Sequence, residues 1–459
     1  MTPRAASGTL APKLPLVLVA LATLLALVVF TAPLTTLDAM TSALDLGAAE
    51  QAWVMSGMPL GAACGLLTAG AFGDALGRRR TFVAGLWITV VSSIGAALAG
   101  SAEMLIVMRI VQGLGSAGIM ACGLGLLGQI YQGEARKQAA AIWAAALGAG
   151  VATGPILSSA FLSVSGWNAI HWIIALISTP LALASVQLPE SPRTGLRVDL
   201  PGALALMVGM AALMSALVEV RVGSSLLVIG LIALAGVLLV LFVRLERRSP
   251  NPILELRLFR SPAFVGATLA AFASGAGVLA LMSMVPTVLV RGLGLSPLAA
   301  AVTILAWSGV TVVAALGARF LPAALSSRAR VIWSILGCAV GQALLFVAGA
   351  DSTWAVLLPG LFVAGVANGI LNASLGHEAV QTVPQERTAM GSAANNTARY
   401  LGSALGISLI SVLIAGAQGE SFFEGWHRAV VATSVISLLG VLAMLLLSRR
   451  DGGGRALPA

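Results

Sequence analysis

Ionised and hydrogen-bonding side chains inside long apolar segments are the residues of this chain most able to do chemistry. Arg109 and Arg399 are the clearest cases, because each lies well within an apolar run. A charge at the middle of a bilayer costs about 2.5–3.5 kcal/mol on insertion scales, so it is expected to face a cavity or a partner group. For each arginine, two roles are equally open: a structural role that holds carbonyls or an acid, and a role in a solute pathway.

Six neutral polar side chains lie in the same kind of segment. They are Gln112, His171, Asn368, Asn372, Asn395 and Asn396. Such groups can contact a solute or hydrogen-bond a neighbouring helix, and each of them taken alone favours the second role.

The sequence contains no pattern typical of an enzyme, a cofactor site or a metal site. Its three cysteines and three histidines are scattered, without CxxC, HExxH or paired catalytic carboxylates. Two matches to GxGxxG, at Gly113–Gly118 and Gly123–Gly128, lie inside one apolar segment, where glycines let helices approach closely. A GxxxxGK[ST] loop for ATP does not occur in the sequence. We therefore expect no enzymatic activity, no cofactor and no metal.

The composition indicates that the main solvent of these segments is a lipid bilayer. Of 459 residues, 58% are hydrophobic and 9% are charged, against about 25% charged in soluble proteins. A water-soluble domain of this length cannot hide so much apolar surface. The same composition excludes intrinsic disorder and a nucleic-acid-binding protein, despite the formal net charge of +9.

Apolar runs of about 20 residues, the length that crosses a bilayer, recur through the chain. They do not alternate with the period of two typical of a membrane β-barrel, so they predict an all-α integral membrane protein with fourteen transmembrane helices. The predicted helices span roughly residues 14–36, 52–72, 81–100, 104–130, 138–163, 167–188, 200–219, 224–243, 262–288, 296–318, 330–349, 354–376, 389–416 and 429–448.

Basic residues are distributed very unequally between the two sides of these helices. With the N-terminus inside, 21 of the 26 lie in inside segments, three lie in outside loops and two lie within helices. The positive-inside rule then predicts that both termini are cytoplasmic, with the basic loops facing anionic lipid. Abundant Ala and Gly with few Lys are typical of a GC-rich bacterium, so we expect the inner (plasma) membrane as the location.

The connection between the second and third predicted helices combines turn-forming glycines with one acid and three bases. Its characteristic residues are Gly70, Asp74, Gly77, Arg78, Arg79 and Arg80. A tight turn with positive-inside arginines is the plain interpretation. The pattern, however, resembles the signature loop of the Major Facilitator Superfamily, G-x-x-x-D-x-x-G-R-[RK]-[RK].

Further matches to this family extend along the chain. Arg109–Gly113 resembles its R-x-x-Q-G motif, and Gly150–Pro155 resembles the G-x-x-x-G-P of its exporters. Asn395, Arg399 and Gly402 resemble the N-x-x-x-R-x-x-G of its fourteen-span drug/proton antiporters. The segment Glu246–Arg260 resembles the loop that precedes the ninth helix in the same antiporters. Trp53 matches the tryptophan that opens the second helix.

The resemblance implies two six-helix bundles and an inserted helix pair. The first bundle would occupy residues 1–188, the linkers and inserted pair 189–260, the second bundle 261–448 and a cytoplasmic tail 449–459. In such transporters the substrate site lies at the midplane between the bundles, which expose it to each face in turn. The implied function is export of hydrophobic small molecules, such as drugs or antibiotics, by a monomeric secondary transporter that exchanges them for protons.

The resemblance also implies which residues control the conformational change. Asp74 is expected to meet a helix N-terminus of the second bundle and to latch the cytoplasmic side. The glycines and the proline of the fifth helix would weaken that helix and seal the outer half, although plain helix packing is an alternative. Ser158 and Ser159 follow where the family often has glycines. The expected gating residues are Gly70, Asp74, Gly77, Arg78, Arg79, Gly150, Gly154 and Pro155.

The first helix departs from the family pattern at the position of the usual proton carrier. Fourteen-span antiporters have L-D-x-T-x-x-N there, whereas this chain has Thr31 at the position of the acid and Thr36 near the asparagine. The departure puts proton coupling and cationic substrates in doubt.

Two replacements for the missing acid are open. Asp38 could pair with Arg109 near the outer mouth, where binding of a proton would release the arginine. Glu378 with His377, at the inner end of the twelfth helix, is the second candidate. Asp38 as a solvated loop acid is the alternative to both.

We expect a central cavity made positive by Arg109 and Arg399, which would prefer neutral or anionic amphiphiles to lipophilic cations. Uptake or facilitated diffusion of one solute is an alternative function, and a membrane sensor or scaffold that does not transport is another. The expected substrate and proton pathway comprises Thr31, Thr36, Asp38, Arg109, Gln112, His171, Asn368, Asn372, His377, Glu378, Asn395, Asn396 and Arg399.

Overall fold

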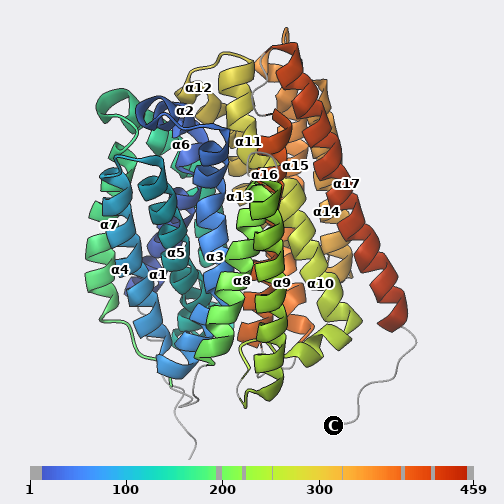
Figure 1. Cartoon of the computed structure of the whole chain (residues 1–459). Helices are drawn as coiled ribbons and strands as arrows, with labels where there is room; N and C mark the ends of the chain where they lie inside the picture. Colours follow the sequence, from blue (N-terminus) through green and yellow to red (C-terminus); the bar gives the residue numbers. More distant parts are fainter. Residues whose placement is uncertain are drawn as a thin grey trace, which may run out of the picture.

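A computed structural model describes residues 13–192, 199–219, 224–250, 252–322, 324–383, 388–414 and 419–451 of the chain. All regular elements in these ranges are helices (Figure 1). Several basic residues used to predict the orientation lie outside the described residues, namely Arg4, Arg193, Arg197, Arg221, Arg387 and Arg455. The same holds for most of the predicted linker 189–199 and for most of the predicted cytoplasmic tail.

The N-terminal helices group on one side of the molecule and are called the first bundle below (Figure 1). They are α1 (Lys13–Thr31), α2 (Pro33–Leu44), α3 (Ala48–Leu76), α4 (Arg78–Ala97), α5 (Ala102–Ile130), α6 (Gly133–Ser165) and α7 (Ala169–Ser185).

The C-terminal helices form the second bundle on the other side (Figure 1). A short 3-10 turn, η1 (Leu256–Arg260), precedes them. They are α10 (Pro262–Ala273), η2 (Ser274–Leu279), α11 (Ala280–Thr287), η3 (Val288–Gly292), α12 (Pro297–Thr303), α13 (Leu305–Gly317), η4 (Ala318–Phe320), α14 (Ser327–Leu344), η5 (Leu345–Val347), η6 (Trp354–Leu357), α15 (Leu358–Gln381), α16 (Thr388–Ile414) and α17 (Glu420–Asp451).

The inserted pair, α8 (Leu200–Glu219) and α9 (Ser225–Arg248), stands between the bundles in Figure 1. α8 packs against α9, α3 and α16, so it contacts both bundles. Trp53 at the start of α3 donates its indole N–H to Glu219 at the end of α8 (3.3 Å). α9 exposes large apolar side chains such as Leu226 and Val237, as expected of a surface that faces lipid.

Thirteen described helices are long and apolar enough to cross a membrane, and α7 is a shorter apolar helix of 17 residues. This set matches the fourteen predicted spans, and α8 has the predicted bounds. α17 begins at Glu420, nine residues before the predicted 429, because Glu420, Glu424, His427 and Arg428 interrupt the apolar run in its first turns. The domain boundaries at 188, 260 and 448 stay a prediction.

The first predicted span is broken into α1 and α2 at Pro33. Proline has no N–H, so the carbonyl of Val29, four residues earlier, loses its partner within the helix. Ala32 still donates to Val28 (2.9 Å), and a new helix then runs on to Leu44. The break leaves an unpaired carbonyl inside the first bundle, and that carbonyl must find a donor elsewhere.

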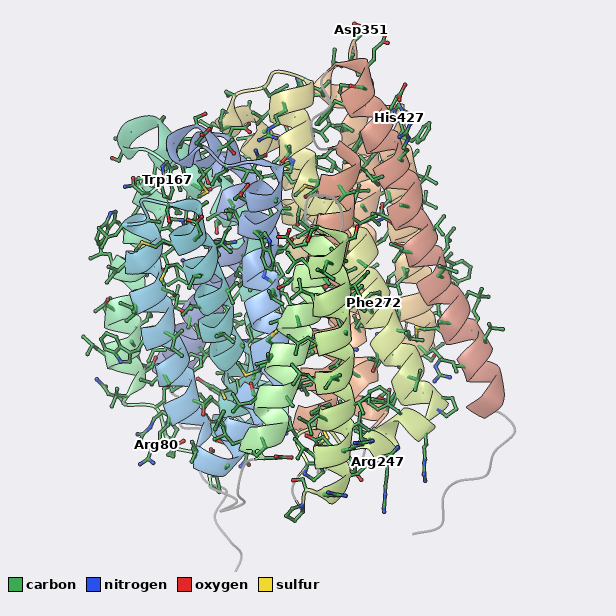
Figure 2. All side chains as sticks on the ribbon, viewed as in Figure 1. Arg80, Trp167, Arg247, Phe272, Asp351 and His427 are labelled. Carbon is green, nitrogen blue, oxygen red and sulfur yellow. The ribbon has the colours of Figure 1, made fainter. Side chains whose placement is uncertain are left out.

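The two ends of the molecule carry different side chains. Arg80 and Arg247 lie at the lower end in Figure 2, which is called the arginine-rich end below. Trp167, Asp351 and His427 lie at the upper end, called the opposite end. The helices run between these two ends, as helices that cross a bilayer must.

Candidate substrate pocket between the bundles

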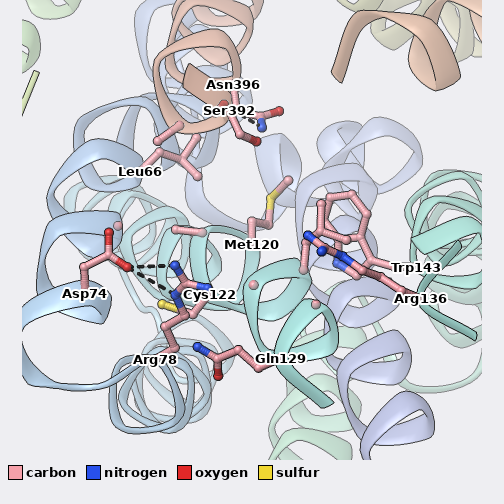
Figure 3. Close-up of a pocket in the computed structure, with 16 residues that line it drawn as sticks. Leu66, Asp74, Arg78, Met120, Cys122, Gln129, Arg136, Trp143, Ser392 and Asn396 are labelled. Carbon is pink, nitrogen blue, oxygen red and sulfur yellow. Dashed lines mark hydrogen bonds and ion pairs between the residues drawn. The ribbon is translucent and has the colours of Figure 1, made fainter. Parts of the chain in front are cut away.

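A pocket of about 160 Å³ lies between the two bundles. The first bundle contributes α1, α5 and α6 to its walls, and the second contributes η2, α13, α15 and α16. It shares five residues with a second pocket of about 270 Å³, shown in Figure 3. The shared residues are Met120, Leu124, Trp143, Ser392 and Asn396. The second pocket reaches Asp74 and Arg78, so the central pocket continues to a mouth at the arginine-rich end.

The two walls of the central pocket differ in chemistry. The first bundle contributes a mostly apolar wall, in which Leu27, Leu147 and Val151 are typical members. The second bundle contributes almost all of the polar groups. These are Ser308, Thr311, Asn368, Asn372, Ser392, Asn395, Asn396, Arg399 and Tyr400. An amphiphile can therefore lie with its apolar side on one bundle and its polar side on the other.

Arg399 lines this pocket from the middle of α16. Close packing of α16 on the π-helical segment η2 places it there, because a Cβ added to Gly275 would overlap the Arg399 carbonyl oxygen. The Nε of Arg399 is buried without a hydrogen-bond partner among the described residues. No acidic side chain lines the pocket within the described part of the chain. The described lining of the pocket therefore contains a cation without a counter-ion.

Two asparagines of α15 present acceptors that are not used. The Oδ1 atoms of Asn368 and Asn372 are buried without a partner among the residues that the structure describes. The amide nitrogen of Asn368 donates to the Thr311 hydroxyl (3.4 Å), which in turn donates to the Gly365 carbonyl (3.2 Å). Buried polar atoms normally have partners, so these oxygens mark places where a ligand group can bind.

The asparagines of α16 are largely occupied. Asn395 donates to the Ala267 carbonyl of α10 (3.1 Å), and Asn396 donates to the Ser392 carbonyl of its own helix (3.0 Å). The expected hydrogen bond between helices is thus found for Asn395, and Asn396 instead bonds within α16.

Three aromatic residues of the pocket were not among the expected site residues. Trp143, Trp307 and Tyr400 line it, and both indole N–H groups are buried without a partner within the described ranges. Tyr400 donates its hydroxyl to the sulfur of Met120 across the bundle interface (3.2 Å). Its position next to Arg399, as one of two tyrosines in the chain, was the signal that could have revealed it.

Arg109 does not line the central pocket, which corrects the expectation of two cavity arginines. It is fully buried inside the first bundle. Its guanidinium donates to the carbonyls of Val29, Phe30 (3.4 Å) and Val54 (3.2 Å), and to the Gln112 side chain (3.1 Å). Arg109 thus supplies the donor for the Val29 carbonyl that Pro33 leaves unpaired.

Gln112 and His171 extend this network inside the first bundle. The Gln112 amide donates to Ser93 (3.1 Å) and lies 3.4 Å from Nδ1 of His171. Both side chains are fully buried, and neither lines the central pocket. They connect α5 to α4 and α7, so the structure places them in the packing of the bundle.

The threonines that stand at the family's acidic and asparagine positions bond to their own helix. Thr31 donates to Leu27 (2.9 Å) and Thr36 to Ala32 (3.0 Å). Both are buried outside the central pocket. Gly154 packs so closely on Thr31 that an added Cβ would overlap its hydroxyl.

Asp38 forms an ion pair with Arg291, and this corrects its expected pairing with Arg109. Arg291 belongs to η3 of the second bundle, and its Nη2 also donates to Gln51 of α3 (3.1 Å). This group, called the opposite-end clamp below, joins the two bundles at the end away from the mouth.

The Gly150–Pro155 motif of the predicted fifth helix lies in α6, which contributes to the same contact between the bundles at the opposite end. Gly150 and Gly154 pack directly on the backbone of α1, so close helix packing is observed there. Ser159, which replaces a family glycine, donates to the Pro297 carbonyl of the second bundle (3.1 Å). Ser158 hydrogen-bonds Thr35 of α2 (3.2 Å). The two serines therefore add hydroxyl contacts where glycines would have allowed only close approach.

The other proposed proton site lies at the arginine-rich end, away from the central pocket. Glu378 is buried and accepts a hydrogen bond from Arg328 (3.4 Å). His377, its neighbour in sequence, instead lies 2.8 Å from the Gln381 amide on the surface of α15. Glu378 is thus buried beside an arginine, whereas His377 is exposed on the helix surface.

The signature loop surrounds the mouth. Asp74 pairs with Arg78 (2.9 Å), and both line the second pocket (Figure 3). Gly70 and Ser392, which lies in the first turns of α16, line the same pocket. Asp74 and the first turns of α16 thus line one pocket, and the latch between them that the resemblance implies stays a prediction.

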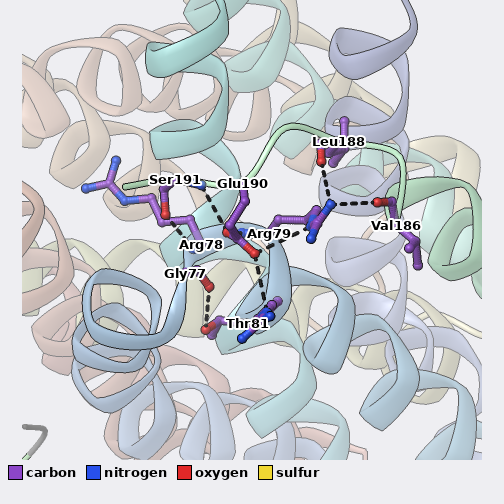
Figure 4. Close-up of polar contacts among 9 residues, drawn as sticks. Gly77, Arg78, Arg79, Thr81, Val186, Leu188, Glu190 and Ser191 are labelled. Carbon is purple, nitrogen blue, oxygen red and sulfur yellow. Dashed lines mark hydrogen bonds and ion pairs between the residues drawn. The ribbon is translucent and has the colours of Figure 1, made fainter. Parts of the chain in front are cut away.

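The arginines of the loop bind the chain that leaves the first bundle. Glu190 accepts from the backbone N–H of Arg79 (3.0 Å) and pairs with its side chain (3.4 Å), and Ser191 accepts from the N–H of Arg78 (2.8 Å) (Figure 4). These N–H groups belong to the first turn of α4, where backbone N–H groups have no acceptor within the helix itself. Gly77 precedes them with φ +112°, a conformation that favours glycine.

Comparison with known proteins agrees with this geometry. The family model described as the Major Facilitator Superfamily matches residues 19–407. The multidrug efflux pump LfrA of Mycolicibacterium smegmatis is 30% identical over 376 residues, which cover 80% of this chain and 73% of LfrA. The multidrug resistance protein Stp of Mycobacterium tuberculosis is 28% identical over 384 residues, covering 82% and 71% of the two chains.

Two further likenesses are to an export protein and to a solved structure. The tetracenomycin C resistance and export protein of Streptomyces glaucescens is 27% identical over 399 residues, covering 83% of this chain and 72% of that protein. The crystal structure of the human organic anion transporter MFSD10 (TETRAN) superposes with a TM-score of 0.66 at 16% identity, covering 94% of this chain and 99% of the other. At that identity, the structural likeness bears on the fold alone.

Proposed function

Because the chain belongs to the Major Facilitator Superfamily, we propose that it is a secondary transporter that exports hydrophobic small molecules. Relatives described as multidrug efflux and export proteins support this class of substrate. The observation that carries the proposal is the central pocket, with an apolar wall, unused polar atoms and an unpaired arginine.

The charge of the pocket selects against cations. At an effective dielectric constant of about 20 and a separation of about 5.5 Å, two like charges repel by about 3 kcal/mol. A lipophilic cation that approaches Arg399 meets this repulsion without a neighbouring carboxylate in the described lining to offset it. The preferred substrates are therefore neutral or anionic amphiphiles, whose polar groups can bind Arg399, Asn368 and Asn372.

The orientation follows from the basic residues. The arginine-rich end faces the cytoplasm of a bacterial cell, in agreement with the positive-inside rule and with the bacterial origin of the relatives. The central pocket then opens to the cytoplasm, which is the side from which an exporter takes its cargo.

Alternating access would require the opposite end to open. In this structure that end is closed by the opposite-end clamp, by the Ser159–Pro297 hydrogen bond and by a Ser56–Ser408 contact (3.2 Å). α2 packs against α11 and α12 there. On this proposal, the closed opposite end and the mouth at the arginine-rich end would make this the inward-facing form of the cycle.

Proton coupling would act through Asp38. A proton on its carboxylate removes the charge that holds Arg291, so the clamp weakens and the opposite end can open. The side chain of Asp38 is 46% exposed, so protons from the outer solution can reach it. Glu378 with Arg328 is the second candidate, at the cytoplasmic end.

The proposal is tested with purified protein in proteoliposomes, by following uptake of a neutral hydrophobic fluorophore after a pH step. Gly376 lines the pocket and has open space around an added Cβ, so Gly376→Leu fills the pocket without disturbing the fold. Gly236 on α9 has equally open space and is the matched control. We expect at least a tenfold loss of transport in Gly376→Leu and no change in Gly236→Leu.

Two results would contradict the proposal. One is equal transport by both glycine variants, because the pocket would then not be the route. The other is transport that is independent of the pH step, which would favour facilitated diffusion over antiport.

A further inference from the structure

A second, separate cavity opens on the outer surface of the second bundle. It is a groove of about 540 Å³ between α14 and α15, near the arginine-rich end. Its lining is almost entirely apolar, with Leu325, Trp333, Phe362 and Val366 as main contributors. The central pocket lies on the other side of α15, which presents Asn368 and Asn372 there.

The groove faces the surroundings of the protein and suits a long apolar chain. Trp333 is 68% exposed and Phe362 is 56% exposed, so its walls are open to the bilayer. A cavity of about 150 Å³ accommodates benzene. A groove of about 540 Å³ therefore has room for a flexible chain several times that size, such as a lipid acyl chain.

Among the residues that the structure describes, Arg330 is the only charged one in the lining. Its Nη2 donates to the Pro322 carbonyl (3.0 Å), which fixes the guanidinium in place. Its Nε is buried without a partner in the described part of the chain, and no acid pairs with Arg330 there. An arginine with an unpaired donor at the end of an apolar groove has the chemistry that binds a phosphate group.

We propose that this groove binds an anionic phospholipid, with an acyl chain between α14 and α15 and the phosphate on Arg330. Basic sites between transmembrane helices at the cytoplasmic side are suited to anionic headgroups. Only the assignment to the inner leaflet rests on the proposed orientation. The lipid would pack on the outer face of the same helix that carries Asn368 and Asn372.

Native mass spectrometry of the purified full-length protein tests this proposal without a transport assay. The protein is incubated with dioleoyl-phosphatidylglycerol or dioleoyl-phosphatidylcholine, which have the same chains and differ in headgroup charge. We expect the anionic lipid to be retained several times more strongly. Arg330→Gln should weaken that retention about five- to tenfold.

Two further variants separate the groove from general charge effects. Val366→Trp fills the groove and should abolish retention of both lipids while leaving Arg330 in place. Arg260→Gln removes an exposed arginine at the same end, outside the groove, and should change nothing. Thermal unfolding in detergent verifies that each variant is folded.

The proposal is overturned by equal retention of the two lipids together with an unaffected Arg330→Gln variant. It is also overturned by a dimer that Val366→Trp dissociates, because the groove would then be an interface between two copies. A chain that binds lipid in this way but fails to transport would contradict the proposed function and leave the lipid site intact.

Discussion

The contact between Arg109 and the break in the first span makes a quantitative prediction about stability. Arg109→Gln removes the donor from the buried carbonyls of Val29, Phe30 and Val54. A hydrogen bond to a charged group contributes about 1.5–3 kcal/mol, and burying the arginine costs several kcal/mol in return. We expect a net loss of about 3–5 kcal/mol, as when a buried ionic partner is removed.

The effects of substituting Pro33 and Arg109 on the free energy of unfolding should be coupled. Pro33→Ala restores an N–H that can bond the Val29 carbonyl, so one of the acceptors no longer needs the arginine. The cost of Arg109→Gln should therefore fall by about 1–2 kcal/mol in the Pro33→Ala background.

Thermal unfolding of the four proteins in detergent measures this coupling. For a chain of 459 residues, at about 1 °C per kcal/mol, Arg109→Gln should lower the Tm by about 3–5 °C in the wild-type background and by clearly less beside Pro33→Ala. Arg428→Gln, which alters an exposed arginine, is the control and should leave the Tm almost unchanged. Effects of the two substitutions that add within about 0.5 kcal/mol would refute the reasoning.

Three further predictions concern other parts of the fold. Asp38→Asn should weaken the opposite-end clamp by about 1 kcal/mol, as for a half-exposed ion pair, and should raise the labelling of engineered cysteines at that end about fivefold. The double exchange Asp38→Arg with Arg291→Asp should restore closure, and a double exchange that does not lower the labelling again would contradict the clamp. Glu190→Gln should destabilise the start of α4 by about 1–2 kcal/mol in thermal unfolding, whereas an unchanged Tm would show that the carboxylate does not cap that helix. Gly275→Ala should cost about 1–3 kcal/mol by separating η2 from α16, with Gly236→Ala as the neutral control; equal Tm values would exclude the tight contact.

The helical architecture was predictable from the sequence because lipid imposes a simple rule. Every crossing needs a long apolar run, and α8 accordingly begins and ends at the predicted residues, Leu200 and Glu219. The start of α17 was missed because charged residues such as Glu420, Glu424 and Arg428 interrupt the apolar run in its first turns.

The candidate site was only partly predictable, because it depends on which helix faces carry the polar groups. The motif and the depth of Arg399 in its helix pointed to a central position, and Arg399 lines the pocket between the bundles. Arg109 has a similar apolar setting, yet it is used within one bundle, since its partner is a carbonyl set free by a proline on another helix. Trp143 and Trp307 could not be distinguished from ordinary core aromatics without knowing which side of α6 and α13 faces the pocket.

The partner of Asp38 was unpredictable for a related reason. Arg291 is far away in sequence and was counted as an ordinary outer-loop charge. Only the approach of η3 to α2 at the opposite end brings the two together.

The central claim is that the unpaired arginine of the pocket selects substrates by charge. Binding of three amphiphiles with the same apolar body and a neutral, anionic or cationic headgroup can be followed by tryptophan fluorescence, because Trp143 and Trp307 line the pocket. A repulsion of about 3 kcal/mol predicts that the wild type binds the cation about 100-fold more weakly than the neutral compound, and that Arg399→Gln removes most of this difference. Tightest binding of the cation by the wild type, or an unchanged preference in Arg399→Gln, would contradict the account.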